Sequence, residues 1–288
     1  MPDNSQLVVC ENARGEKIRF PDENSPISVI SFDGFGSMEF DVKTSQNSGQ
    51  DGENYNTSQA KKRNPTITFD IQSDYQRQRG RLHSFFQPRS WGTIYYYETE
   101  GGEGRKARYQ VESLQIADYG VSRTGTLSLI CPDPKWYALD DQLTQLARRR
   151  GLITFPLRIS NPFKVSEIVK SLIANIYNSS AVPMGLTVTF RSSGAVVNPS
   201  LYDINRQQLM QINTTMHTGD QIVITTGEGN KRVRLISGGV TSNINNLMQY
   251  PPKWLQAQQG DNLYRYNADS GINSLSVTIK STQAYWGA

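Results

Sequence analysis

The chain has 288 residues, with 30 lysines and arginines, 26 aspartates and glutamates and a formal net charge of +4. This length predicts two domains, because single hydrophobic cores stop growing beyond about 250–300 residues. The small positive excess argues against a dedicated nucleic-acid-binding protein. No apolar run approaches the roughly 20 residues of a membrane helix, and the N-terminus lacks a secretory signal pattern, so we expect folding in the cytosol.

Alternation of apolar and polar residues with a period of two is the dominant pattern, and it predicts strands with one buried face. The strands predicted in this way cover residues 66–72, 126–131, 186–191 and 275–280. In the first of them, Ile67, Phe69 and Ile71 would share the buried face. Many short strands separated by glycine turns are typical of antiparallel sandwiches or barrels, so the fold class is mainly β.

Residues 43–63 are almost wholly polar, with Tyr55 as the single aromatic residue. A stretch of this length between two predicted strands is too long for an ordinary hairpin turn. It is either a disordered loop or an arm that orders against another chain, and an arm of this kind needs a partner surface to offset its ordering entropy.

One helix is expected near residues 74–86, where Leu82, Phe85 and Phe86 fall on one face together with Tyr75. Ser73, followed three residues later by a glutamine, fits a capping box at its start. Pro88 follows the predicted helix and would end it.

A second connection runs from about residue 132 to 161 and is rich in proline, so we place the domain boundary there. Within it, residues 140–150 are consistent with a short helix, because aspartates start the segment, three arginines end it and Gly151 follows. Residues 163–178 match both helical spacing and two short strands around Lys170, and periodicity alone does not decide between them.

Chemical motifs are largely absent. The sequence contains no phosphate-binding loop, no GxGxxG and no GxSxG. Two cysteines, Cys10 and Cys131, exclude a disulfide scaffold and a cysteine-rich metal site, and two distant histidines give poor support to a metal site or triad. Asp133 with Asp140 and Asp141 fits a turn and a helix start better than a catalytic cluster. We therefore expect no enzyme activity, no catalytic or metal-binding residues and no cofactor.

Exposed aromatic and basic residues leave two binding functions open. Trp91, Trp136, Trp254 and Trp286 could stack on sugar rings, but packing in a core or domain interface is the more frequent role of tryptophan. The basic clusters fit solvated faces, and phosphate binding by them would be generic and sensitive to salt. The first alternative function is therefore a carbohydrate-binding β-sandwich for cell-wall attachment, and the second is a nucleic-acid-binding β protein.

Taken in order along the chain, a set of short segments resembles the distal tail proteins of long-tailed bacteriophages, the siphovirus-type tail component family. The segments in the first half are Ser31–Gly36, Arg63–Ile71, Arg81-Leu82 with Phe85-Phe86, Tyr95–Tyr97, Arg108–Val111 and Leu127–Trp136. Those in the second half are Asn178–Pro183, Asn198-Pro199, Thr218–Ile222, Lys231-Arg232, Trp254-Leu255, Gly260–Leu263 and Tyr285–Gly287. Their order and spacing over nearly the whole chain carry the resemblance.

The resemblance implies a ring-forming N-terminal β-sandwich with one α-helix over residues 1–137, and its arm would be residues 43–63. A linker over 138–160 would lead to a galectin-like jelly-roll over 161–288, and residues 163–178 would be strand. The sugar-binding runs of galectins are absent, so this fold does not imply a lactose site.

The function implied is that of a structural hub of the phage tail tip or baseplate. It would be a homo-hexameric ring that joins the tail tube protein to the tail-associated spike or lysin and to receptor-binding proteins, with DNA passing through a central channel. The ring would assemble in the bacterial host cytoplasm and reside in the virion, without membrane contact. The arm residues expected at the interface between subunits are Asn47, Gln50, Tyr55, Asn56, Lys61, Lys62 and Arg63.

Overall fold

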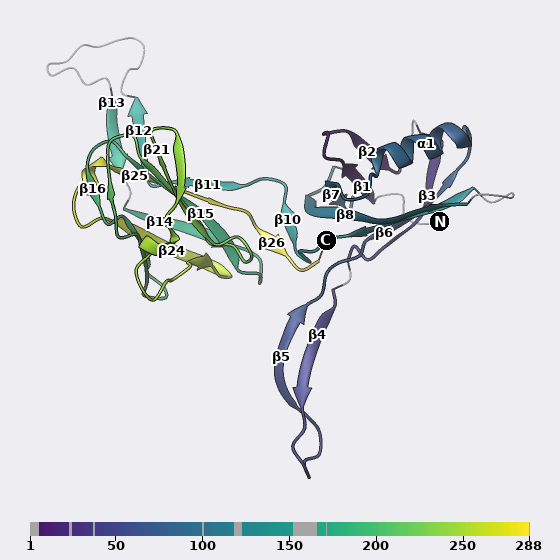
Figure 1. Ribbon diagram of the computed structural model, residues 1–288, viewed down its shortest axis with the longest axis horizontal. Coiled ribbons are helices and arrows are strands. Elements are labelled where there is room, and N and C mark those ends of the chain that lie inside the picture. Colours follow the sequence, from purple (N-terminus) through teal and green to yellow (C-terminus); the bar gives the residue numbers. More distant parts are fainter. Residues whose placement is uncertain are drawn as a thin grey trace. The chain divides into compact units, whose positions relative to one another are not determined.

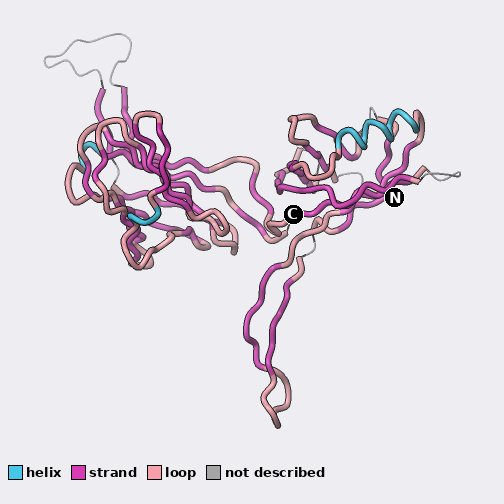
Figure 2. Tube along the Cα trace, viewed as in Figure 1, coloured by secondary structure: helices cyan, strands magenta, loops and turns pink. Residues whose placement is uncertain are grey.

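The computed structural model describes residues 6–22, 25–36, 38–99, 101–117, 123–151, 166–170 and 172–287. The chain divides into two compact units. The first contains residues 1–139 and 285–288, and the second contains residues 140–284. Strands dominate both units (Figures 1 and 2), which confirms the mainly β fold class.

The first unit is built on an antiparallel sheet, which has nine strands within the described residues. Seven strands follow the order β2-β1-β7-β8-β9-β6-β3, and β10 pairs with both β8 and β26. The strands are β1 (Leu7–Glu11), β2 (Lys17–Phe20), β3 (Ile27–Asp33), β6 (Thr66–Ile71), β7 (Trp91–Tyr97), β8 (Gly104–Ile116), β9 (Thr124–Ile130), β10 (Trp136–Ala138) and β26 (Ala284–Tyr285). The strands at the two ends of the order, β2 and β3, approach each other, so the sheet curves around one core.

The core of the first unit lies on one face of this sheet. Ile67, Phe69 and Ile71 of β6 are fully buried, as the alternation predicted. The helix α1 (Tyr75–Phe85) covers the apolar face of the sheet (Figure 1), and its Leu82 and Phe85 are buried there. The helix contributes to the core because its apolar stripe faces the sheet.

The start of α1 differs from the predicted capping box. The residue at the cap position is Asp74, whose backbone is left-handed with φ 51°, and no side chain caps the helix. A capping serine needs an extended backbone at the cap position itself, whereas Ser73 lies one residue before it. The first helical turn is closed instead by the backbone, because the Gln78 amide donates to the Asp74 carbonyl at 3.0 Å.

A long hairpin leaves the first unit between β3 and β6 (Figure 1). It consists of β4 (Phe40–Ser45) and β5 (Asn54–Ala60), which pair only with each other in the described part of the chain. Most of the segment 43–63 is therefore not a disordered loop but part of an antiparallel ribbon, which contains one register shift and has a turn at its tip.

The second unit is a sandwich of two main sheets. In the described residues, the larger sheet has the order β11-β25-β15-β20-β21-β22 with β23 on β15, and the smaller has the order β14-β24-β17-β18. Two further pairs are β12 with β13 and β16 with β19. The elements are β11 (Gln142–Gln145), β12 (Ala147–Gly151), β13 (Ser166–Lys170), β14 (Ile173–Asn178), β15 (Met184–Ser192), β16 (Val196–Val197), β17 (Ser200–Asp203), β18 (Gln208–Gln211), β19 (Thr215–Met216), β20 (Gln221–Thr225), β21 (Arg232–Ser237), β22 (Val240–Asn243), η1 (Asn245–Leu247), β23 (Gln256–Ala257), β24 (Gly260–Asn267), η2 (Ile272–Ser274) and β25 (Leu275–Ser281).

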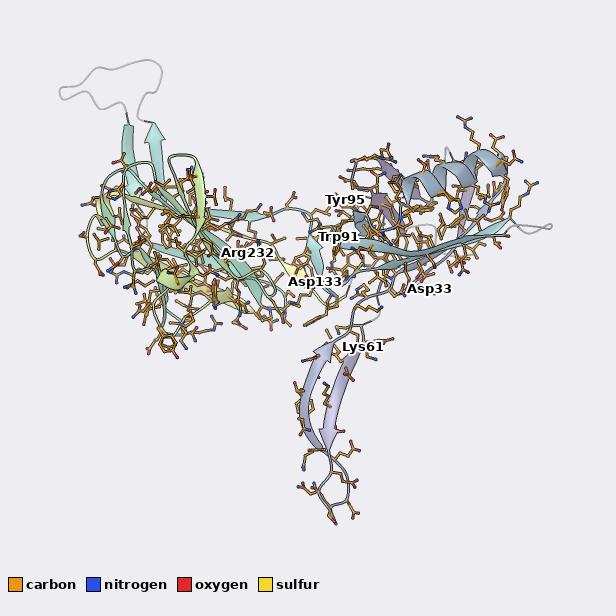
Figure 3. The ribbon with its side chains drawn as sticks, viewed as in Figure 1. Asp33, Lys61, Trp91, Tyr95, Asp133 and Arg232 are labelled. Carbon is orange, nitrogen blue, oxygen red and sulfur yellow. The ribbon has the colours of Figure 1, made fainter. Side chains whose placement is uncertain are left out.

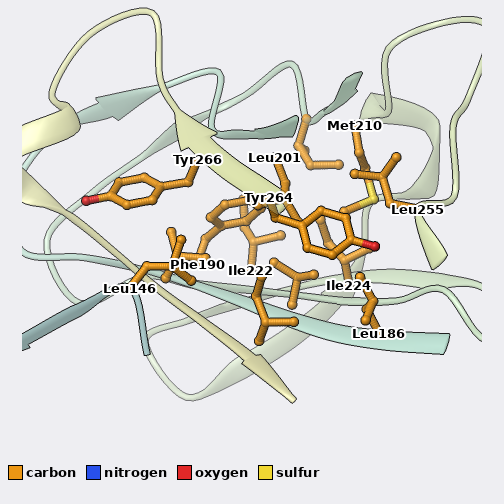
Figure 4. Close-up of a cluster of buried hydrophobic side chains, with 14 of the residues drawn as sticks. Leu146, Leu186, Phe190, Leu201, Met210, Ile222, Ile224, Leu255, Tyr264 and Tyr266 are labelled. Carbon is orange, nitrogen blue, oxygen red and sulfur yellow. The ribbon is translucent and has the colours of Figure 1, made fainter. Parts of the chain in front are cut away.

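Side chains from both sheets fill the core of this sandwich (Figure 4). Phe190 and Ile222 come from the larger sheet, whereas Leu201, Tyr264 and Tyr266 come from the smaller one, and all five are fully buried. The two apolar faces meet as the alternation in these strands requires.

Two predictions about the start of this unit have different outcomes. The prediction of a short helix at 140–150 is wrong, because residues 142–145 form β11, which pairs with the edge of β25, and Leu146 is buried in the core. Ladder hydrogen bonds and this burial outweigh a helix preference that rested on terminal charges and a following glycine. Within 163–178, β13 and β14 confirm the strand interpretation, and residues 163–165 and 171 lie outside the described residues.

The predicted linker at 138–160 differs from the structure in the same region. Residues 140–151 belong to the second unit, where β11 and β12 are paired strands. Residues 152–160 lie outside the described residues.

Candidate oligomer interface

The β4–β5 hairpin has one apolar and one polar face. Phe40 lies opposite Ala60 and Val42 lies opposite Ser58, and residues paired in this way project to the same side of the ribbon. The register shifts after Lys43, so Asn56 is an extra residue and Thr44 pairs with Tyr55. The shift keeps the Tyr55 ring on the side of Val42, and its hydroxyl donates to Ser58 Oγ at 3.0 Å.

This apolar face is not buried against the rest of the chain. Val42 is 55% exposed and Tyr55 is 65% exposed, and Phe40 at the root is 39% exposed although its ring packs edge-on against Trp286. An isolated two-stranded hairpin is marginally stable in water. Apolar side chains displayed on such a ribbon are therefore typical of a surface that another molecule covers.

Hydrogen bonds within the loop order the tip of the hairpin. The Gln50 amide donates to the Asn47 carbonyl at 3.1 Å, and Gln46 Nε2 donates to the Gln50 carbonyl at 3.0 Å. Gly49 and Gly52 take the left-handed backbone that this turn needs, with φ 82° and 81°. The tip is thus a preformed turn, which lowers the entropy that it would lose on docking.

Arg63 anchors the root of the hairpin and is 5% exposed. Its guanidinium donates to the carbonyls of Phe35 at 2.7 Å, Pro134 at 3.1 Å, Gly34 at 3.2 Å, and also Trp286. It lies 5.6 Å from the centre of the buried Trp136 ring, a cation–π distance. Burial lowers the pKa of Arg63 from its ordinary value.

The other root residues line an open pocket of about 340 Å³. Lys61 lies there (Figure 3), with its Nζ 3.6 Å from Glu39 Oε2. Lys62 follows, and its charge helps to lower the pKa of Glu112, after the hydrogen bonds that this carboxylate accepts from Ser128 and Asn64. The pocket gives the root a positively charged hollow beside the hairpin.

The structure places the seven predicted arm residues in three positions. Asn47 and Gln50 form the tip, Tyr55 and Asn56 lie in β5, and Lys61, Lys62 and Arg63 form the root. Arg63 is buried and holds the hairpin to its own unit, so it is a structural residue and not an exposed contact. Sequence reasoning missed Phe40 and Val42, because the arm was taken to begin at residue 43. Their alternation with Asp41 and Lys43 was the available signal.

Several other residues that the sequence offered as candidates for binding or catalysis make contacts within the fold instead. Trp136 is fully buried and stacks on Phe35 at 6.2 Å, so it cannot serve a sugar site. Trp91 is 43% exposed and lies under Arg108 at 4.9 Å. Asp133 accepts the Lys135 amide and the Tyr137 hydroxyl, as a turn residue does.

Residues with reactive or metal-binding side chains give no site in the described part of the chain. Cys10 and Cys131 are buried, and desolvation raises the pKa of both thiols. No group of three or more histidine, cysteine, aspartate or glutamate residues is placed to hold a metal ion among the described residues. None of the helices described there is long and apolar enough to span a membrane.

Comparisons with known proteins identify solved structures with a similar fold. No protein-family model matches the chain, and no curated protein matches it. Among solved structures, the Dit protein of phage SPP1 aligns with a TM-score of 0.69 at 12% identity, over 96% of this chain and 98% of that one. That protein is described as a paradigm of the hub adsorption apparatus in phages that infect Gram-positive bacteria. Two structures of the phage P2 baseplate in its activated conformation, with Ca and with Sr, align with TM-scores of 0.51 and 0.52 at 11% identity, over 98% of this chain and 99% of theirs. The resemblance read from the sequence is thus confirmed for the fold, and the chain has the fold of phage tail hub and baseplate proteins.

Proposed function

We propose that this protein is a structural hub of a phage tail tip or baseplate, which forms a homo-hexameric ring around a channel for DNA. The ring joins the tail tube protein on one side to the spike or lysin on the other, and receptor-binding proteins attach at its rim. The fold shared with SPP1 Dit over 96% of the chain supports this role. The protein acts by assembly rather than by chemistry, and its place is the virion after assembly in the host cytoplasm.

The exposed apolar face of the β4–β5 hairpin is the observation that carries the proposal. In a single chain Val42 and Tyr55 remain in water, and docking on a neighbouring copy would bury them and supply a hydrophobic driving force. The hairpin and the surface that receives it are different parts of the molecule. Such a heterologous contact repeats from copy to copy and closes into a ring when its rotation allows.

The test compares the solution mass and negative-stain images of the full chain with those of a variant whose residues 42–58 are replaced by Asn-Gly. Asp41 and Gln59 are paired in the ribbon, so a two-residue turn between them shortens the hairpin and keeps its root. We expect a six-fold ring for the full chain and a monomer for the variant. A shortened variant that still forms rings would refute the role of the hairpin.

A finer variant separates the two faces of the ribbon. Replacing Val42 and Tyr55 by serine should weaken each contact between subunits by roughly tenfold or more, because about half of each apolar side chain is still available for burial. The matched control is Lys43→Ser on the polar face, which should leave assembly unchanged. Equal effects of the two changes would show that the apolar face is not the docking face.

A further inference from the structure

We propose that the acidic tip of one hairpin docks into the basic pocket at the root of the next copy's hairpin, so that Asp51 and Glu53 meet Lys61 and Lys62. The proposal rests on the ring proposed above and names the receptacle for the tip. It assigns the pocket to a second copy of this chain.

The pocket has the charge and the rigidity of a receptacle. Its lining contains three cationic side chains, Lys61, Lys62 and Arg63, and one carboxylate, Glu39. Because Arg63 is fixed by hydrogen bonds to four carbonyl oxygens, the backbone beneath the two lysines is held in place. Lys61 is half exposed in its contact with Glu39, so its ammonium group remains accessible to a second carboxylate.

The tip carries the complementary charge. Between Thr44 and Ala60 the sequence contains two acidic residues, Asp51 and Glu53, and no lysine or arginine. Both carboxylates lie in an exposed segment whose turn is ordered by its own hydrogen bonds. A preformed acidic turn suits a fixed basic hollow, because opposite potentials align the two surfaces and little entropy is lost.

The hairpin's length rules out an internal contact between tip and root. The strand β5 separates Glu53 from Lys61, and extended strands rise about 3.3 Å per residue, so the acidic tip lies roughly 25 Å from its own root. The tip can therefore reach only the pocket of another molecule. Since each copy offers one tip and one pocket, the contact repeats head to tail, which is the arrangement that closes a ring.

The test uses charge reversal in the full-length protein, with two double variants. One carries Lys61→Glu and Lys62→Glu, and the other carries Asp51→Lys and Glu53→Lys. Each variant alone should raise the protein concentration needed for assembly by roughly tenfold or more at low salt, because attraction becomes like-charge repulsion. An equimolar mixture should regain ring formation, because wild-type tips then meet wild-type pockets and reversed tips meet reversed pockets. Rescue on mixing also shows that each variant is folded.

Two outcomes would overturn the proposal. In the first, each double variant assembles at the same protein concentration as the unmodified chain. In the second, both variants keep the thermal midpoint of the unmodified chain, yet their mixture forms rings no better than either variant alone. Either result would refute tip-to-root docking, and the ring itself would stand if the shortened hairpin still abolished assembly. Rings formed by the shortened variant would instead refute the hairpin-closed ring.

Discussion

Replacing Arg63 by methionine should strongly destabilise the first unit. The side chain is 5% exposed, and its guanidinium satisfies the carbonyls of Gly34, Phe35, Pro134 and Trp286. Hydrogen bonds to a charged group contribute about 1.5–3 kcal/mol each. The sum is reduced because the Phe35 carbonyl keeps a bond from Trp136 Nε1 and because a buried cation carries a desolvation cost. The net loss should be about 3–5 kcal/mol.

Calorimetry of the full chain measures this effect as the thermal midpoint of the first unit. One kcal/mol shifts the midpoint of a unit of this size by about 2–4 °C, so Arg63→Met should lower it by roughly 10 °C. The matched control is Arg77→Met, an exposed arginine of α1 outside the proposed interface, which should change stability by less than about 0.5 kcal/mol. Arg63→Lys should not restore stability, because an ammonium group lacks the planar fork that reaches several carbonyls. If Arg63→Met and Arg77→Met had equal, small effects, the anchoring argument would fail.

Two further predictions concern single residues in each unit. Gly34→Ala should lower the free energy of unfolding of the first unit by about 2 kcal/mol or more, because Gly34 has φ 77° and an added Cβ would lie 2.4 Å from the Asn64 carbonyl oxygen. The control is Gly36→Ala, whose Cβ would meet no atom within 4 Å and which should have little effect. Equal shifts of the thermal midpoint in the two variants would contradict the reasoning. Asp220 accepts hydrogen bonds from Ser237 and the His217 amide that lower its pKa. Its contribution to stability is therefore complete at neutral pH and is lost as the pH falls through this depressed pKa. The gap in thermal midpoint between the wild-type chain and Asp220→Asn should narrow from pH 6 to pH 3, and a constant gap would show that the carboxylate charge does not contribute.

The positions of the main strands were predictable from the sequence alone. The alternation in 66–72 corresponds to β6, whose odd-numbered residues from Ile67 to Ile71 are buried, and the same pattern holds in β9, β15 and β25. The helix α1 was found from its apolar spacing to within a residue or two at each end. These predictions succeeded because burial of one face imposes a period that is visible within a short segment.

Interactions between distant segments decided the rest. Residues 142–145 are strand because β25, more than 130 residues away, offers an unpaired edge, and no local pattern contains that edge. The apolar face of the hairpin depends on the bulge at Asn56, which keeps Tyr55 on the side of Val42. Arg63 looked like one more cation at the end of a polar arm, but only the fold brings the carbonyls of Phe35, Pro134 and Trp286 around it. A residue type and its neighbours predict local conformation, whereas a buried partner far along the chain is defined only once the sheet has formed.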